Sequence, residues 1–118
     1  MSSEADFYAA IKGLVSNRVY PDIAPIGAVE PYITWQGVGG KSLRFLDNTP
    51  GDKRHTRLQV NVWAKTRTQA SLIARQIEDA LCASSLFQAT PLGEPVSDYD
   101  SETKSYGAMQ DFSIYSAR

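Results

Sequence analysis

The segment GVGGKS, residues 37–42, ends in the Gly-Lys-Ser that closes a phosphate-binding loop. Such a loop reads G-x-x-x-x-G-K-[ST], follows a buried strand, and opens a helix whose first N–H groups hold phosphate. Gly40, Lys41 and Ser42 fit that pattern, but Trp35 stands where the first glycine belongs. The turn-rich letters DNTPGD follow, and the proline among them forbids a helix of useful length. The segment therefore predicts a glycine-bent hairpin and no nucleotide site.

Three acidic residues, Asp98, Asp100 and Glu102, alternate in the segment SDYDSETKSY, in the manner of a calcium-binding loop. The glycine and the distal glutamate of a complete calcium loop are absent. Alternate residues of a hairpin are commonly acidic because they face water. We expect a solvated hairpin turn here and no metal site.

The chain has one histidine and one cysteine. His55 follows the turn-rich segment, and no serine or cysteine is placed to be activated by it, so we expect an exposed loop residue rather than a base. Cys82 ends a predicted helix with no second cysteine or histidine near it in sequence, which favours an inert packing role. No catalytic residue and no cofactor are predicted.

Two amphipathic helices are predicted from apolar residues at helical spacing. Ser3 is expected to cap the first helix with Asp6 as its reciprocal partner, and Thr66 the second with Gln69. The buried stripe predicted for the first helix is Phe7, Ala10, Ile11, Leu14 and Val15. That of the second is Ala70, Ile73, Ala74, Ile77, Ala80 and Leu81.

Strands are predicted at residues 32–38, 42–46 and 57–65, after a proline-pinned connector at residues 18–31. In the third of these strands, alternate apolar residues form a core face, which leaves Trp63 on the opposite, polar face. A tryptophan in that position either contacts a partner or lies beneath a loop of its own chain.

A hairpin turn and a closing strand are predicted after the second helix. The inward residues of the closing strand are Tyr106, Ala108, Phe112 and Ile114. Gln110 interrupts this alternation, which indicates either a β-bulge or an edge position. The whole order is α-β-β-β-α-β-β, which predicts an α+β fold: a single domain spanning residues 1–118, with an antiparallel sheet and both helices packed on one face.

Composition excludes several classes of protein. The 118 residues are 42% hydrophobic and 21% charged, as in an ordinary globular domain, and the net charge is −1. No apolar run is long enough to span a bilayer, and no apolar block of a signal peptide opens the chain, so no membrane contact is expected. No basic field predicts specific nucleic acid binding. The single cysteine excludes an intramolecular disulfide and is typical of the cytoplasm.

Charge is distributed unevenly along the chain. Basic residues dominate residues 41–75, and acidic residues dominate from residue 76 onward. The two regions are either ordinary solvated faces, or surfaces by which the molecule meets a partner or copies of itself, basic side to acidic side.

Four segments carry a family resemblance: LVSNRVYPDIAP, PYITWQ, HTRLQVNVWAKTRTQASLIARQIEDAL and DYDSETKSYGAMQDFSIYS. Together they resemble the small tail-completion, or tail-terminator, proteins of long-tailed, siphovirus-like bacteriophages and prophages. The strongest part is the strand LQVNVWAKT, which leads directly into the helical segment QASLIARQIEDAL. The resemblance extends from about Leu14 to Tyr115.

This resemblance implies a structural virion protein and not an enzyme. Such proteins are made in the host cytoplasm and form a ring, usually a homohexamer, on the head-proximal end of the tail tube. The ring stops tube polymerisation and provides the surface that joins the head. The implied partners are copies of the chain itself, the tail tube protein and the head–tail connector protein.

A closed ring joins two different patches of neighbouring subunits. The candidates for these patches lie in the basic stretch and the acidic hairpin, with Trp63 as an apolar addition. They are Arg44, Lys53, Arg54, Arg57, Trp63, Asp98, Asp100 and Glu102.

The competing interpretation is a small cytoplasmic ligand-binding or enzymatic α+β domain that uses its sheet face as a pocket. Such a protein would bind a small molecule as a monomer or dimer, whereas a terminator would form rings or cap tubes.

We predict that the protein does not bind ATP or GTP, because Trp35 and the turn-rich continuation remove both the glycine and the helix that a phosphate loop needs. Isothermal titration with the magnesium nucleotides should give no heat of binding. Micromolar binding that Lys41→Ala abolishes would overturn this interpretation.

Overall fold

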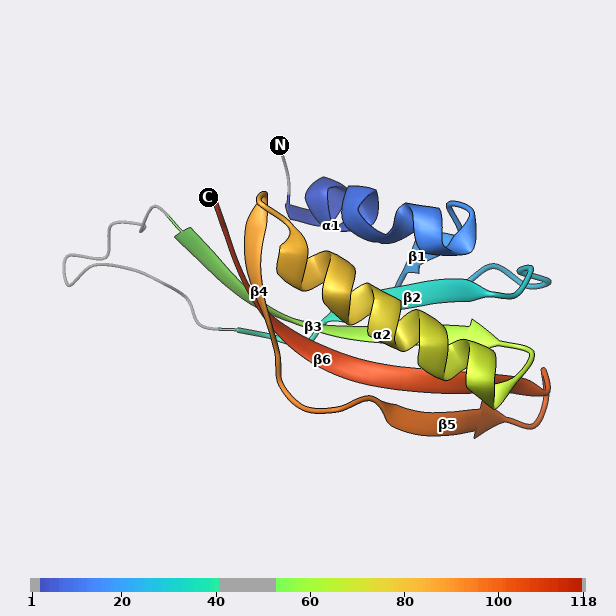
Figure 1. Ribbon diagram of the computed structural model, residues 1–118. Coiled ribbons are helices and arrows are strands. Elements are labelled where there is room, and N and C mark those ends of the chain that lie inside the picture. The colour runs from blue at the N-terminus through green and yellow to red at the C-terminus, as the bar shows by residue number, and fades with distance from the viewer. Residues whose placement is uncertain (1–2, 41–52, 118) are drawn as a thin grey trace.

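The computed structural model describes residues 3–40 and 53–117 and places them in a curved sheet with two helices on one side (Figure 1). The strand predicted at residues 42–46, and most of the turn predicted after it, lie outside the described residues. The predicted α+β class, with an antiparallel sheet and both helices on one face, is confirmed. The described chain contains one unpredicted strand, β1 (Val19–Pro21), before the long central strand, and it has three strands after the second helix where this order has two.

The described elements follow one another along the chain without a repeated unit. In order they are α1 (Ser3–Ile11), the 3-10 helix η1 (Lys12–Val15), β1 (Val19–Pro21), β2 (Tyr32–Gly37), β3 (Lys53–Ala64), α2 (Arg67–Ala83), β4 (Phe87–Pro91), β5 (Val96–Asp100) and β6 (Ser105–Ala117). Among the described residues, no helix is long and apolar enough to cross a membrane.

The sheet has the strand order β1-β2-β3-β6-β4, and β5 also pairs with β6. β5 pairs with the first half of β6, and β4 with the second half. β1 and β2 are parallel, and the other strand pairs are antiparallel. β3 and β6 therefore form the centre of the sheet.

The pairing of β3 with β6 is continuous from Lys53 opposite Ala117 to Ala64 opposite Tyr106. Because side chains alternate between the two faces of a strand, this register places the apolar residues of both strands toward the helices. The buried apolar residues are those predicted from the alternation: Leu58, Val60, Val62 and Ala64 from β3, and Ala108, Phe112 and Ile114 from β6. Tyr106, which was also predicted to point inward, is only partly buried against the core.

No β-bulge interrupts β6 at Gln110, but the other predicted alternative, an edge position, fits on one side of the strand. Pairing with β5 ends at Met109 and pairing with β4 begins at Phe112, so neither strand pairs with Gln110. It lies opposite Val60 in the uninterrupted register, and its side chain is buried. The side-chain Nε2 donates hydrogen bonds to Glu78 Oε1 of α2 and to the carbonyl oxygen of Gly93, both at 2.7 Å. These two acceptors satisfy the NH2 group of the buried amide, whereas its Oε1 atom is buried without a hydrogen-bond partner.

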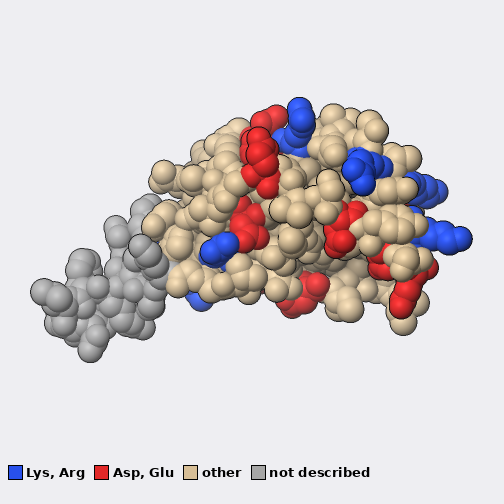
Figure 2. All heavy atoms as spheres, turned by 90° about the horizontal axis from the view of Figure 1, so that it is seen from below, with Lys and Arg blue, Asp and Glu red and all other residues tan. Residues whose placement is uncertain are grey.

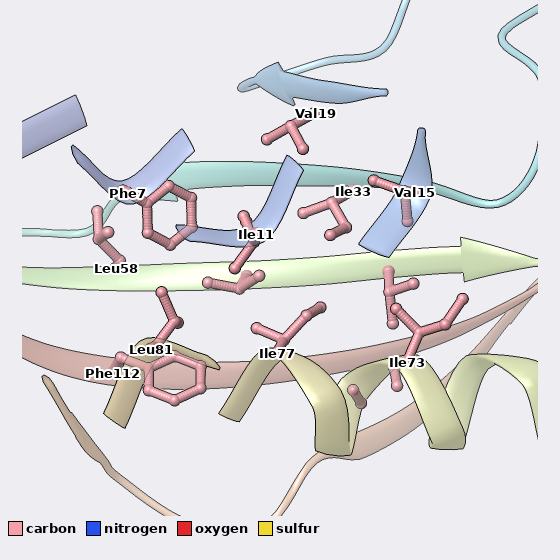
Figure 3. Close-up of a cluster of buried hydrophobic side chains, with 14 of the residues drawn as sticks. Phe7, Ile11, Val15, Val19, Ile33, Leu58, Ile73, Ile77, Leu81 and Phe112 are labelled. Carbon is pink, nitrogen blue, oxygen red and sulfur yellow. The ribbon is translucent and has the colours of Figure 1, made fainter. Parts of the chain in front are cut away.

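The core lies between the helices and the sheet, where side chains of α1, η1 and α2 point toward those of β2, β3 and β6 (Figure 3). The buried stripes of both helices consist of the predicted residues. Three of these, Ala10, Leu14 and Ala80, are only partly buried, at the margin of the core. Full burial of an aliphatic or phenyl side chain stabilises a fold by roughly 1.5–3 kcal/mol, so these stripes hold both helices on the sheet. The labelled members of the cluster are Phe7, Ile11, Val15, Val19, Ile33, Leu58, Ile73, Ile77, Leu81 and Phe112.

Helix boundaries follow local chemistry. The Oγ1 atom of Thr66 accepts a hydrogen bond from the backbone N–H of Gln69 at 3.1 Å, which confirms the predicted cap of α2. After η1, Ser16 and Asn17 have φ angles of 52° and 67°, so the chain leaves the helix at these two residues. The capping role predicted for the Ser3 side chain lies outside what the structure describes.

β1 was not predicted, because it lies inside the proline-rich connector. Its three residues pair with Ile33, Thr34 and Trp35 of β2. The Nε of Arg18 donates to the carbonyl oxygen of Pro31 at 2.9 Å and ties the two ends of the connector together. Proline at the end of a short edge strand leaves the ladder intact up to that point.

Trp63 lies on the face of the sheet that the helices leave open, directly opposite Gly107 in the β3–β6 register. A Cβ atom on Gly107 would be only 2.8 Å from the Cζ3 atom of the indole ring. The ring therefore packs on the glycine backbone, and Trp63 is half-buried by its own chain. A side chain at position 107 would displace it.

We expect Gly107→Ala to lower the free energy of unfolding by about 1–3 kcal/mol, because the added methyl group overpacks against the indole. Urea unfolding followed by circular dichroism measures this change. Gly13→Ala is the control, since a Cβ there meets no atom within 4 Å. Equal stability of the two variants would show that Trp63 moves aside freely.

Candidate functional site

A hollow of about 810 Å³ lies on the helix-free face of the sheet. Its floor consists of residues of β2 and β3, including Tyr32 and Trp63, and its walls are the segment 22–30 and the turn between β5 and β6. Four carboxylates line it, namely Asp22, Glu30, Asp100 and Glu102, and no lysine or arginine does. We call this hollow the acidic groove.

The segment that forms one wall is held by the sheet. The backbone N–H of Asp22 donates to the carbonyl oxygen of Trp35 at 2.7 Å, and that of Ala28 donates to Pro25 at 3.1 Å. Asp22 and Gly27 have φ angles of 63° and 81°, so the chain turns sharply at both positions. Aspartate and glycine are among the residues that adopt this conformation most readily.

Glu30 and Tyr32 show that the groove is electrostatically negative. The Oε2 atom of Glu30 is buried without a hydrogen-bond partner. Burial raises the pKa of the Tyr32 hydroxyl above its ordinary value, and the negative charges of Glu30 and Asp100, together with Tyr20, raise it further. A phenol whose ionisation is opposed by nearby carboxylates indicates that a positive charge would be stabilised at the same place.

The predicted hairpin of β5 and β6 is confirmed, and its carboxylates hold the turn. Asp98 Oδ1 accepts from the backbone N–H of Tyr99 at 2.7 Å, and Asp100 Oδ1 accepts from that of Glu102 at 3.0 Å. Within the part of the chain that the structure describes, no three His, Cys, Asp or Glu side chains are grouped so as to hold a metal ion.

The basic stretch of the sequence does not form one patch in space. Arg54 is exposed near the start of β3, whereas Lys65 follows the end of that strand, roughly 35 Å away at about 3.3 Å per residue. Arg44 and the side chain of Lys53 lie outside the described residues. Figure 2, which views the molecule from the side where β5 lies in Figure 1, shows basic and acidic residues in several separate places.

Arg57 is engaged within its own chain. Its Nη2 and Nε atoms donate to Asp111 Oδ2 of β6 at 2.7 and 3.2 Å. An arginine that already holds a carboxylate across the sheet is less available to a neighbouring subunit. Of the predicted basic residues, Arg54 is therefore the one that the structure describes as exposed and without such a pairing.

His55 differs from the prediction in two respects. It lies within β3 rather than in a loop, and its ring is half-buried, 4.5 Å from that of Tyr115. Its Nε2 atom is 2.7 Å from Ser113 Oγ, so a serine does stand beside it. Cross-strand neighbours of this kind are set by the β3–β6 register and are invisible in the sequence around residue 55.

Cys82 is exposed near the end of α2, so it fills no gap in the core. Burial of the thiol, followed by the negative charges of Glu78 and Asp79, raises its pKa. A raised pKa reduces the thiolate fraction and therefore the reactivity of the sulfur.

Of the predicted interface residues, the structure brings Trp63, Asp100 and Glu102 together in the acidic groove. Sequence reasoning missed Asp22, Glu30 and Tyr32, which the proline-rich connector and the start of β2 contribute to the same hollow. In the sequence, Asp22 and Glu30 are marked only as acidic residues next to prolines. That pattern does not indicate which strand ends they will lie beside in the fold.

We predict that Tyr32 titrates above the ordinary range of tyrosine, and that Glu30→Gln lowers its pKa partway, since burial remains. The phenolate absorbance is measured against pH, and Tyr32→Phe identifies the transition. The pKa of Tyr32 is higher in the folded chain than in the unfolded chain, so the protonated phenol favours the folded state. Its contribution to the free energy of unfolding is present below pH 10 and declines as the pH rises toward the folded pKa. Asp98→Asn is the matched control. An equal change in the pKa of Tyr32 in both variants would contradict the assignment of this effect to Glu30.

The comparisons with known proteins agree with this fold. The family model described as "Tail completion protein gp17" matches residues 8–117. A solved chain of the "Virion of native gene transfer agent (GTA) particle" is similar, with a TM-score of 0.66 and 17% identity over 99% of this chain and 96% of that chain. At that identity the likeness shows a common fold. No curated protein matches the chain. Because the family match covers nearly all of the sequence, the chain belongs to the tail completion protein gp17 family and is a structural component of a virion tail rather than an enzyme.

Proposed function

We propose that the protein forms a homohexameric ring on the head-proximal end of the tail tube. There it stops addition of tube subunits and presents its other face to the head–tail connector protein. The match to a tail completion family over residues 8–117 is the observation that carries this proposal. The chain would be made in the host cytoplasm and act in the assembled virion.

The charge distribution supports a ring built from unlike contacts. In a closed ring, a patch on each subunit meets a different patch on the next. The acidic groove lies at the end of the sheet where β3 finishes, and Arg54 lies near its beginning. Because β3 separates these two surfaces, they cannot contact each other within one chain. They can contact each other between neighbouring subunits that are arranged head to tail.

The proposed contact residues remain those indicated by the sequence, but we expect them to contribute unequally to the contact. Arg54, with Arg44 and Lys53 near it in sequence, would face Asp98, Asp100 and Glu102 of the next subunit, and Trp63 would add apolar contact. Arg57 contributes less, because Asp111 of its own chain already occupies it. Exposed ion pairs are worth roughly 0–1 kcal/mol each, so they would set register more than affinity.

The competing function is the binding of a small molecule in the acidic groove. Its volume of about 810 Å³ is within the range of ligand pockets. Such pockets are mostly apolar and enclosed, whereas this one is open and lined by carboxylates. Saturable binding of a small cation by a monomer that never associates with tail tubes would favour this alternative.

Added to growing cognate tail tubes, the protein should arrest elongation and appear as one cap per tube in negative-stain electron micrographs. Tubes assembled without it serve as the control. A termination ring covers the surface to which the next tube subunit would bind, so arrest and capping should appear together. Undiminished tube growth in excess protein would refute the terminator function.

A further inference from the structure

The acidic groove combines negative charge with exposed aromatic surface. Burial, and after it the negative charges of Glu30 and Asp100, raise the pKa of Tyr32, and the indole of Trp63 lines the same hollow. A cation above an aromatic face is attracted by the ring quadrupole, and a guanidinium can also donate two hydrogen bonds to one carboxylate. The chemistry of the groove therefore fits an arginine side chain better than a compact metal ion.

The wall of the acidic groove exposes several large apolar side chains to solvent. Ile23 and Ile26 line the hollow and have exposed fractions of 82% and 107%, and Val29 of the same segment is 63% exposed. Large apolar side chains clustered in this way at the rim of a polar hollow mark an interaction site. A protein segment, rather than a free ion or small cation, would cover them.

The chain itself carries a segment of matching chemistry. Arg54 is exposed near the start of β3, and Trp63 is nine residues further along that strand, a span of about 30 Å. A rigid strand keeps the two apart in one chain, so Arg54 cannot fold back into its own groove. In a second copy, the same arginine is free to enter.

We propose that the acidic groove receives Arg54 from a second copy of this chain. The guanidinium lies between the carboxylates of Glu30 and Asp100 and against Trp63, while Ile23 and Ile26 cover the stem of the arginine and the backbone beside it. The carboxylate of Glu30, which lines the groove, accepts a hydrogen bond from the arginine. The inference rests on the proposed function in so far as it requires copies to meet.

Two pairs of variants test the contact. The groove variant carries Glu30→Gln and Glu102→Lys, and its control carries Asp79→Asn and Glu94→Lys, which make the same charge change at exposed sites outside the groove. The arginine variant carries Arg54→Glu, and its control carries Arg75→Glu, on an exposed position of α2. Circular dichroism establishes that each variant is folded.

Self-association is measured by sedimentation velocity. The groove variant and the arginine variant should each associate roughly fivefold to thirtyfold more weakly than the wild type, with both controls unchanged. In an equimolar mixture, the intact groove of one variant can still bind the intact Arg54 of the other. The mixture should therefore form pairs but no larger species, whereas the wild type, in which every copy keeps both surfaces, should also form larger ones.

A second readout does not depend on the charge changes. In a Trp35→Phe background, Trp63 is the only tryptophan of the chain, and its emission should shift as the wild-type groove is filled. The shift should depend on protein concentration and disappear in the Arg54→Glu variant. An emission that is unchanged while the chain associates would show that the contact lies elsewhere.

The remaining outcomes separate this inference from the proposed function. If the wild type associates only on tube ends, the same variants are compared for capping there. Capping by the groove variant at wild-type efficiency would refute the inference and leave the terminator function standing. Normal self-association of the groove variant combined with a loss of capping would assign the groove to the tail tube and overturn the inference. Absence of both association and capping in the wild type would refute both.

Discussion

The continuous pairing of β3 with β6 is the constraint on which the other features of the structure depend. Its register directs the apolar residues of both strands to one face, where α1 and α2 can cover them. A slip of one residue would turn every one of these side chains to the opposite face, so burial of the core selects this register. The helix-free face is then determined as a consequence, with Trp63 opposite Gly107 and Arg57 beside Asp111.

The same pairing sets the distances that matter for assembly. A continuous strand of this length carries Arg54 near one end and finishes beside the acidic turn of β5 and β6 at the other. Carboxylates that are dispersed along the sequence thereby meet in one groove, and Arg54 lies at the other end of the strand. A protein of this shape and charge is suited to unlike contacts between neighbours, the kind of contact from which closed rings are made.

Much of the fold could be predicted from local pattern. The cap at Thr66, the stripe from Ala70 to Leu81 and the alternation from Leu58 to Ala64 depend only on neighbours in sequence, and the structure confirms them. Burial of the Gln110 side chain was not predicted, because its acceptors, Glu78 and Gly93, come from other parts of the chain. β1 was missed because a three-residue strand among prolines has no periodicity to detect.

By itself the sequence determined the fold class, the two helices, the core faces and the kinship with tail completion proteins. These follow from the spacing of apolar residues and from segments long enough to be distinctive. Only the tertiary structure decided that Asp22 and Glu30 meet Asp100 and Glu102 in one groove, and that Arg57 turns to Asp111 while Arg54 stays exposed. The physical reason is that electrostatic and aromatic contacts act through space between strand ends, and strand order and register bring those ends together.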